Sequence, residues 1–297
     1  MNSEVSLIDQ FIAFAESKGL PLDQVDVLPD GQWHSFNDPE GSSSNSNARY
    51  ILTDEPWSGA VGTHSGGWHC ESWRPRGNSK LTSSQWNEIK QKQEQRKSEQ
   101  EDKYDQAARR ATKLYSGAVR ASPSHPYLVR KGIKPHGLKQ HGDDLLIPIY
   151  NLSHQIQTLQ LIKSDGTKKL FPGGKKQGGF HVVGDWTSNF KLYVAEGWAT
   201  AATVHEMTGE PCVCAVDCGN LEPAIAALKE WLTPTWELCI AADNDWETTG
   251  NPGLTKALQA AAKHGTGLWI PPFTDVDKGL SDWNDWHMKH NQGTRND

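Results

Sequence analysis

The chain has 297 residues, and its 30 lysines and arginines against 36 aspartates and glutamates give a formal net charge of −6. This length accommodates two or three modules, and the charge excludes a surface that is basic throughout, as nonspecific DNA binding would favour. There is no signal peptide and no apolar run long enough to cross a membrane, so we expect a cytoplasmic protein without membrane contact.

Residues 1–80 are rich in glycine, serine and tryptophan and predict a small β-rich module that could bind a nucleic-acid template. Its four tryptophans either form a core or stack on unpaired bases: Trp33, Trp57, Trp68 and Trp73. Four residues could in principle bind zinc: His34, His64, His69 and Cys70. No Cys-x-x-Cys pair accompanies them, so we do not expect zinc.

Residues 81–122 are dominated by alternating charges, which predicts an exposed helical linker. Such a helix is usually a solvated spacer. A second interpretation is that four of its basic residues contact a nucleic-acid backbone: Arg96, Lys97, Arg109 and Arg110.

Residues 123–190 predict a basic subdomain of mixed α and β structure. Apolar runs at 145–150 and 157–163 indicate two strands, and a segment rich in lysine and glycine follows them. Glycines let backbone N–H groups approach a phosphate, and lysines neutralise it. We therefore predict that five lysines bind nucleotide or template: Lys131, Lys168, Lys169, Lys175 and Lys176. The alternative is a solvated, lysine-rich hairpin.

Residues 191–297 alternate short apolar runs with helical segments. Strands are predicted at 191–195, 211–216, 238–242 and 267–271, separated by helices at 199–207, 221–232 and 253–264. Three strand–helix repeats followed by a strand predict an α/β fold whose sheet is mostly parallel, with right-handed crossovers.

Carboxylates follow two of these strands. Glu196 comes directly after the first strand, and Asp243 and Asp245 come directly after the third. Side chains at the carboxyl ends of parallel strands line the crevice where ligands bind in such sheets. Carboxylates gathered at one point need a cation between them, and hard oxygen ligands suit Mg²⁺ or Mn²⁺.

These motifs resemble the Toprim domain, and in particular the Toprim DNA primases of plasmids and phages. The resemblance rests on Glu-Gly-Trp-Ala-Thr-Ala at 196–201, Val-Asp-Cys-Gly-Asn-Leu at 216–221 and Asp-Trp-Asn-Asp at 282–285. It implies a Rossmann-like Toprim domain over 191–297, with Glu196, Asp243 and Asp245 as catalytic residues and metal ligands. Asp282 and Asp285 would be further metal ligands. One departure is Thr200, which stands where the primases of bacterial chromosomes carry an aspartate.

The resemblance also implies an activity. Such an enzyme copies a single-stranded DNA template into a short RNA primer from ribonucleoside triphosphates, by metal-dependent nucleotidyl transfer in the cytosol of a bacterial host. The chain has no P-loop motif, so a replicative helicase would be a separate partner. Two alternatives stay open at this point: a Toprim nuclease, and a non-catalytic protein that binds single-stranded DNA or a host replication factor.

Overall fold

The computed structural model describes residues 6–22, 25–39, 47–54, 57–64, 68–75, 83–186 and 191–291. The chain divides into two compact units, residues 1–96 and 97–297. Within the described ranges, no helix is both long and apolar enough to cross a lipid bilayer.

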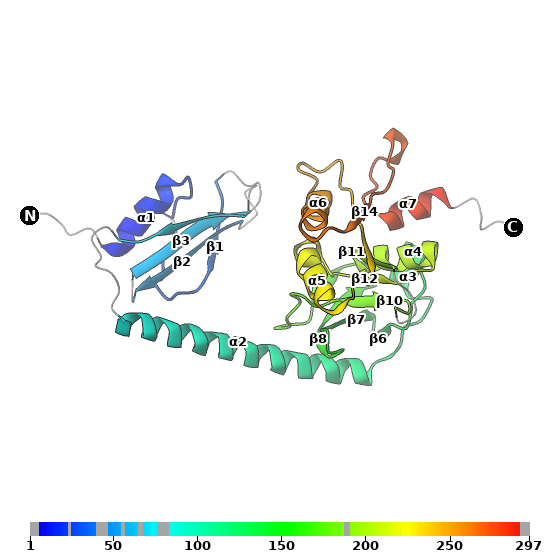
Figure 1. The fold of residues 1–297 in the computed structure, drawn as a ribbon, viewed down its shortest axis with the longest axis horizontal. Coiled ribbons are helices and arrows are strands. Elements are labelled where there is room, and N and C mark those ends of the chain that lie inside the picture. The colour runs from blue at the N-terminus through cyan, green and yellow to red at the C-terminus, as the bar shows by residue number, and fades with distance from the viewer. Residues whose placement is uncertain are drawn as a thin grey trace, which may run out of the picture. The chain divides into compact units, whose positions relative to one another are not determined.

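The first unit is an antiparallel sheet with one helix on it (Figure 1). Its elements are α1 (Leu7–Ser17), β1 (His34–Phe36), β2 (Ala48–Asp54), β3 (Trp57–Thr63) and β4 (His69–Trp73), with strand order β1-β2-β3-β4. Ser6 and Asp9 form a capping box that begins α1, and Phe11 and Ala15 bury its apolar face.

The tryptophans of this unit fall into two groups. Trp73 belongs to the buried core, where its ring meets the ring of Phe11 edge-on. Trp33 and Trp68 are 47% and 44% exposed and contact each other. Trp57 is partly buried and packs against the same core. Two tryptophans therefore serve the core, and both interpretations remain for the surface pair.

The second unit begins within helix α2 (Ser83–Gly117) and continues into an antiparallel sheet. The strands are β5 (Val119–Arg120), β6 (Lys139–His141), β7 (Asp144–Tyr150), β8 (Ile156–Lys163) and β9 (Lys168–Leu170), hydrogen-bonded in that order. Helix α3 (Pro126–Lys131) lies between β5 and β6 in sequence. The end of α2 is not a solvated spacer: Ala111 is fully buried against Leu146 and Leu159.

The remaining elements form the predicted α/β sheet. They are β10 (His181–Val183), β11 (Lys191–Ala195), α4 (Trp198–Thr208), β12 (Cys212–Cys214), α5 (Cys218–Trp231), β13 (Glu237–Ala241), α6 (Pro252–His264), β14 (Gly267–Trp269), a 3-10 turn (Asp275–Asp277) and α7 (Trp283–His290). The strand order is β10-β12-β11-β13-β14. Only β10 is antiparallel among these strands of the described chain. The predicted fold class is therefore confirmed.

Helices cover both faces of this sheet (Figure 1). Helix α4 packs in a core that also includes α3, strands β7 and β8 and Trp283 of α7, so the two sheets of this unit share one hydrophobic cluster. Helices α5 and α6 pack on the opposite face, through Leu221, Ile225 and Ala257 among others. Burial of this sheet on both faces explains why its strands are almost wholly apolar.

Asn220 fastens the glycine-rich segment after β9 to the end of β12. Its Nδ2 donates to the carbonyl oxygens of Gly179 (2.8 Å) and Ala215 (2.9 Å), and its Oδ1 accepts from the Gly178 N–H (2.8 Å). The side chain is 1% exposed, so water could not replace these bonds.

We predict that Asn220→Ala lowers the free energy of unfolding by about 3 kcal/mol, because it leaves buried backbone groups without partners. Urea denaturation followed by circular dichroism measures this. Gln177→Ala, at an exposed position of the same segment, is the control and should change the midpoint little. An equal effect of the two substitutions would contradict this role of Asn220.

Candidate active site

Two carboxylates lie side by side because their strands are parallel neighbours. Ala195 at the end of β11 pairs in register with Ala241 at the end of β13. Glu196 follows the first strand and Asp243 follows the second after one more residue, so both reach the same edge of the sheet. They line a cavity of about 280 Å³.

A third carboxylate and several cations complete this cavity. Asp282, which caps the N-terminus of α7, contributes the third carboxylate. The basic residues that line the cavity come from α3 and β9: Arg130, Lys131 and Lys168. Acidic and basic groups therefore face one another across a space of small-molecule size.

Burial and repulsion by neighbouring carboxylates raise the pKa of all three carboxyl groups. Burial raises the pKa of Asp243 well above its ordinary value, and the nearby Asp282, Glu196 and Asp245 raise it further. Burial likewise raises the pKa of Glu196, against a hydrogen bond from the Cys218 N–H that lowers it. Burial followed by the charge of Asp285 raises the pKa of Asp282. Lys168 opposes the shift at each of the three carboxyls.

The carboxylate set fits a divalent cation chemically. The Oδ1 atom of Asp243 is buried and has no hydrogen-bond partner, an arrangement that is costly unless a cation or a proton satisfies the oxygen. Among the described residues, no three acidic, histidine or cysteine side chains already converge at metal-ligand spacing. The carboxylates would therefore have to turn toward a bound ion.

The two other predicted metal ligands lie differently. Asp245 is close enough to raise the pKa values of Asp243 and Glu196, but it does not line the cavity. Asp285 accepts a hydrogen bond from the Lys131 ammonium group at 3.0 Å. This ion pair joins α3 to α7. The two residues, both predicted to be in the site, therefore bind each other.

The loop that carries Asp243 is tied to the loop that carries Asp282. The Asn244 N–H donates to the Ser281 carbonyl oxygen at 2.7 Å, and the Trp246 indole N–H donates to that of Leu280 at 3.3 Å. At the start of α6, a Cβ on Gly253 would lie 3.0 Å from Asp245 Oδ2 and 3.2 Å from Asp243 Cβ. Any side chain at this position would press these aspartates out of place by a few tenths of an ångström.

A second loop, at residues 215–218, supports Glu196, because the Cys218 N–H donates a hydrogen bond to the Glu196 carboxylate. Val216, which lines the cavity, has a φ of 81°, an unfavourable conformation for a β-branched residue. It directs the chain into Asp217, whose carboxylate caps α5 and pairs with the Lys176 ammonium group. Backbone strain held by surrounding contacts is typical of functional sites.

The five predicted lysines do not gather at one site. Lys168 lines the carboxylate cavity, whereas Lys175 lines a separate, larger cavity beside α2. Lys168 and Lys169 belong to strand β9 rather than to a loop, and Lys169 does not line the carboxylate cavity. Lys131 and Lys176 are in ion pairs with Asp285 and Asp217.

Sequence reasoning missed Arg130 as a lining residue. Its guanidinium donates to the Ser164 carbonyl oxygen at 3.0 Å and lies over the Tyr127 ring, which also lines the cavity. The sequence predicted only the next residue, Lys131, as a binding residue. The helical position of Arg130, on α3, gave no local signal that it faces the carboxylates.

Comparison with known families places a Toprim domain at residues 191–293. The chain is 37% identical over 188 residues to a DNA primase TraC of Escherichia coli, across 60% of this chain and 18% of that protein. It is 33% identical over 200 residues to a second Escherichia coli DNA primase TraC, across 64% of this chain and 14% of that protein. The resemblance to Toprim primases of the plasmid type is therefore confirmed, and the chain spans under a fifth of these relatives' length.

Among solved structures, the chain is similar to the primase fragment of the bacteriophage T7 primase-helicase protein. The TM-score is 0.43 and the identity 16%, over 58% of this chain and 75% of that one.

We predict that Asp243→Asn stabilises the metal-free protein at pH 8, by about 1 kcal/mol or roughly 2–4 °C in Tm. The folded-state pKa of Asp243 is raised above 3.8. Between the unfolded-state pKa and the folded-state pKa, the folded protein therefore binds more protons than the unfolded chain. Stability therefore falls as the pH rises through the folded-state pKa, and the variant should show a weaker fall. Thermal unfolding in EDTA across pH 5–8 measures this.

Asp275→Asn, at an exposed position, is the control and should leave the pH profile unchanged. Loss of stability in Asp243→Asn at pH 8 without metal would mean that burial and repulsion do not make the Asp243 charge unfavourable. In Mg²⁺ the order should reverse, because only the parent keeps the Asp243 charge for the ion.

Proposed function

We propose that this chain is a DNA primase that copies single-stranded DNA into a short RNA primer from ribonucleoside triphosphates. The observation that carries the proposal is the cavity in which Glu196 and Asp243 meet Lys168 and Arg130. Carboxylates for a metal ion and cations for phosphates are what nucleotidyl transfer requires. The DNA primase description of the two relatives supports the same activity.

Each residue has a proposed role. Asp243 and Asp245, with Asp282 or Asp285 as an outer ligand, would hold Mg²⁺ or Mn²⁺, which would neutralise the triphosphate and the developing charge at phosphorus. Glu196 either completes this ligand set or accepts the proton of the attacking 3′-hydroxyl. Lys168 and Arg130 bind the phosphate oxygens. Lys131 and Lys176 act through their ion pairs, which hold α7 and the α5 cap in place.

The partners follow from this activity. The template is single-stranded DNA, and the substrates are ribonucleoside triphosphates. A replicative helicase on a separate chain remains a prediction, as does a site of action in the bacterial cytosol during plasmid or phage replication.

We predict that Glu196→Gln, Asp243→Ala and Asp245→Ala each reduce primer synthesis by at least about a hundredfold, as loss of a group that acts on the transition state does. The assay contains the full chain, a random single-stranded template, labelled ribonucleotides and Mg²⁺. Asp275→Asn is the matched control and should be fully active. Near-normal synthesis by the three variants would place the chemistry elsewhere, and template cleavage without synthesis would indicate a nuclease.

We predict that Lys168→Ala raises KM for ribonucleoside triphosphates by about tenfold, because it removes a charge-assisted hydrogen bond to phosphate. Lys163→Ala, at an exposed position of the preceding strand, is the control. Lys169→Ala tests the neighbouring lysine, whose side chain points to the opposite face of β9. An unchanged KM in Lys168→Ala would remove this lysine from the nucleotide site.

A further inference from the structure

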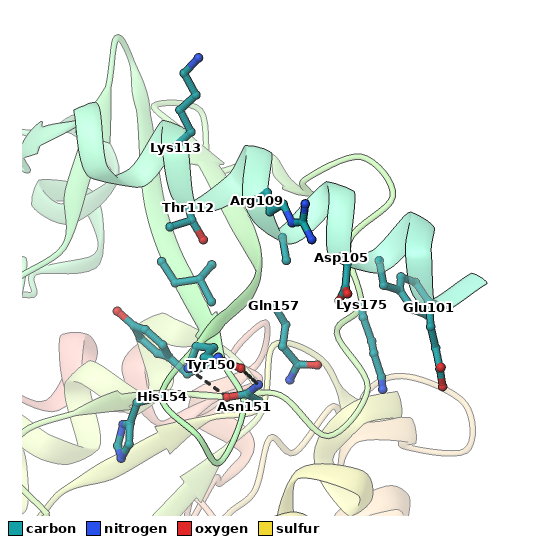
Figure 2. Close-up of a pocket in the computed structure, with 14 residues that line it drawn as sticks. Glu101, Asp105, Arg109, Thr112, Lys113, Tyr150, Asn151, His154, Gln157 and Lys175 are labelled. Atoms are coloured by element: carbon teal, nitrogen blue, oxygen red, sulfur yellow. Dashed lines mark hydrogen bonds between the residues drawn. The ribbon is translucent and has the colours of Figure 1, made fainter. Parts of the chain in front are cut away.

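A second and larger cavity lies between α2 and the β7–β8 connection (Figure 2). Its volume is about 970 Å³, and it shares no lining residue with the carboxylate cavity. The primase reaction as described above assigns it no role.

The lining of this cavity combines apolar groups with cations and amides. Arg109 and Lys175 supply positive charge, and Gln157 supplies an amide (Figure 2). Two acidic residues of α2, Glu101 and Asp105, lie on the helix side. Cations and amides suit phosphate oxygens and base edges, respectively. The two carboxylates should repel a phosphate backbone, so removing one of their charges should strengthen the binding of such a backbone.

The helix wall of this cavity is firmly attached to the sheet. Ala107 and Ala111 of α2 are buried, and the Arg110 guanidinium donates to the Pro172 carbonyl oxygen at 3.1 Å. Arg110 also lies over the Phe171 ring. Arg109 is therefore presented from a fixed surface, although it belongs to the segment predicted to be a linker.

A pinned turn projects an aromatic ring at the edge of the cavity. His154, one of the lining residues, has a φ of 57° and is exposed. The Asn151 side chain holds the turn, because its Oδ1 accepts from the N–H groups of Ser153 and Gln155, both at 2.9 Å.

Next to His154 lies a stacked pair of tryptophans. The His154 ring meets Trp186 edge-on at 6.0 Å, and Trp186 stacks on Trp231 at 4.8 Å and 25°. Trp231 is 49% exposed. A half-exposed indole that stacks on a second indole is a surface on which an unpaired base can stack.

We propose that this cavity, His154 and the Trp186–Trp231 pair form a binding track for single-stranded DNA. The identification of that strand as the template rests on the proposed function. Cations with stacking aromatics are the pattern of single-strand binding, and a duplex would keep its bases out of reach of Trp231.

The glycine-rich segment at 172–179 connects this track to the carboxylate cavity. Lys175 lines the track, and the next residue, Lys176, pairs with Asp217 at the cap of α5. The N–H of the residue after Asp217 is the hydrogen-bond donor to Glu196. Two contacts therefore link the backbone beside Lys175 to the proposed catalytic residue Glu196.

The test is fluorescence anisotropy of the full chain with a labelled 16-nucleotide single strand, in EDTA and without nucleotides. Trp231→Ala should raise Kd by about tenfold, and Trp231→Phe should retain most of the affinity. Arg109→Ala should weaken binding several-fold and reduce the slope of log K against log salt by about one. Asp105→Asn should strengthen binding, a gain that damage to the fold would not produce.

The controls are Arg120→Ala, at an exposed edge strand, and Asp275→Asn, at an exposed position; both should bind as the parent does. The proposal is overturned if Trp231→Ala and Arg109→Ala keep Kd within about twofold of the parent, or if a duplex of the same sequence binds equally well. Because metal and nucleotides are absent, this failure is distinct from failure of primer synthesis. A chain that binds through the track but makes no primer would overturn the proposed function alone.

Discussion

The second unit of the chain holds three carboxylates close together at one edge of its mostly parallel sheet. Parallel pairing of β11 with β13 brings Glu196 and Asp243 to one edge of the sheet, and the cap of α7 adds Asp282. Burial and repulsion by neighbouring carboxylates raise the pKa of each of these carboxyls, so their charges work against the stability of the fold when no cation is bound. Lys168 and the Cys218 N–H offset part of this repulsion. A bound cation would remove most of it, which couples stability to occupancy.

The contacts around the carboxylates explain how the fold tolerates this repulsion. Asn244 is bonded to the Ser281 carbonyl oxygen, and the Asn251 side chain donates to that of Asn244 at 2.7 Å. On the other side, Asn220 joins two backbone segments that contribute no carboxylate. None of these amides lines the carboxylate cavity. These amides fix the loops. The loops therefore hold the carboxylates near one another despite their repulsion.

The sequence predicted those features that depend on local pattern. Alternating strands and helices were enough to place Glu196 and Asp243 at one sheet edge, because parallel strands present their carboxyl ends together. Pairings between distant residues left no such signal. Lys131 and Asp285 were each predicted to be in the site, yet they are 154 positions apart and bind each other. The packing of α2 was missed for a related reason: its few buried alanines stand among many charges, and alanine is a weak hydrophobic marker.

If the proposed function holds, the two cavities of this unit would bind different ligands of primer synthesis. The carboxylate cavity combines negative charge with a few cations, which suits a metal-bound triphosphate but repels a long phosphate backbone. The cavity beside α2 contains cations, amides and adjoining aromatic rings, which suit a strand but include no buried carboxylate pair to hold a metal. A protein with a net charge of −6 can bind both ligands only if its positive charge is local. Lys175 of the segment at 172–179 lines the cavity beside α2, and the next residue, Lys176, pairs with Asp217, whose neighbour Cys218 donates its N–H to Glu196. Asn220 holds the end of that segment in place, so the two proposed binding sites share a supporting contact.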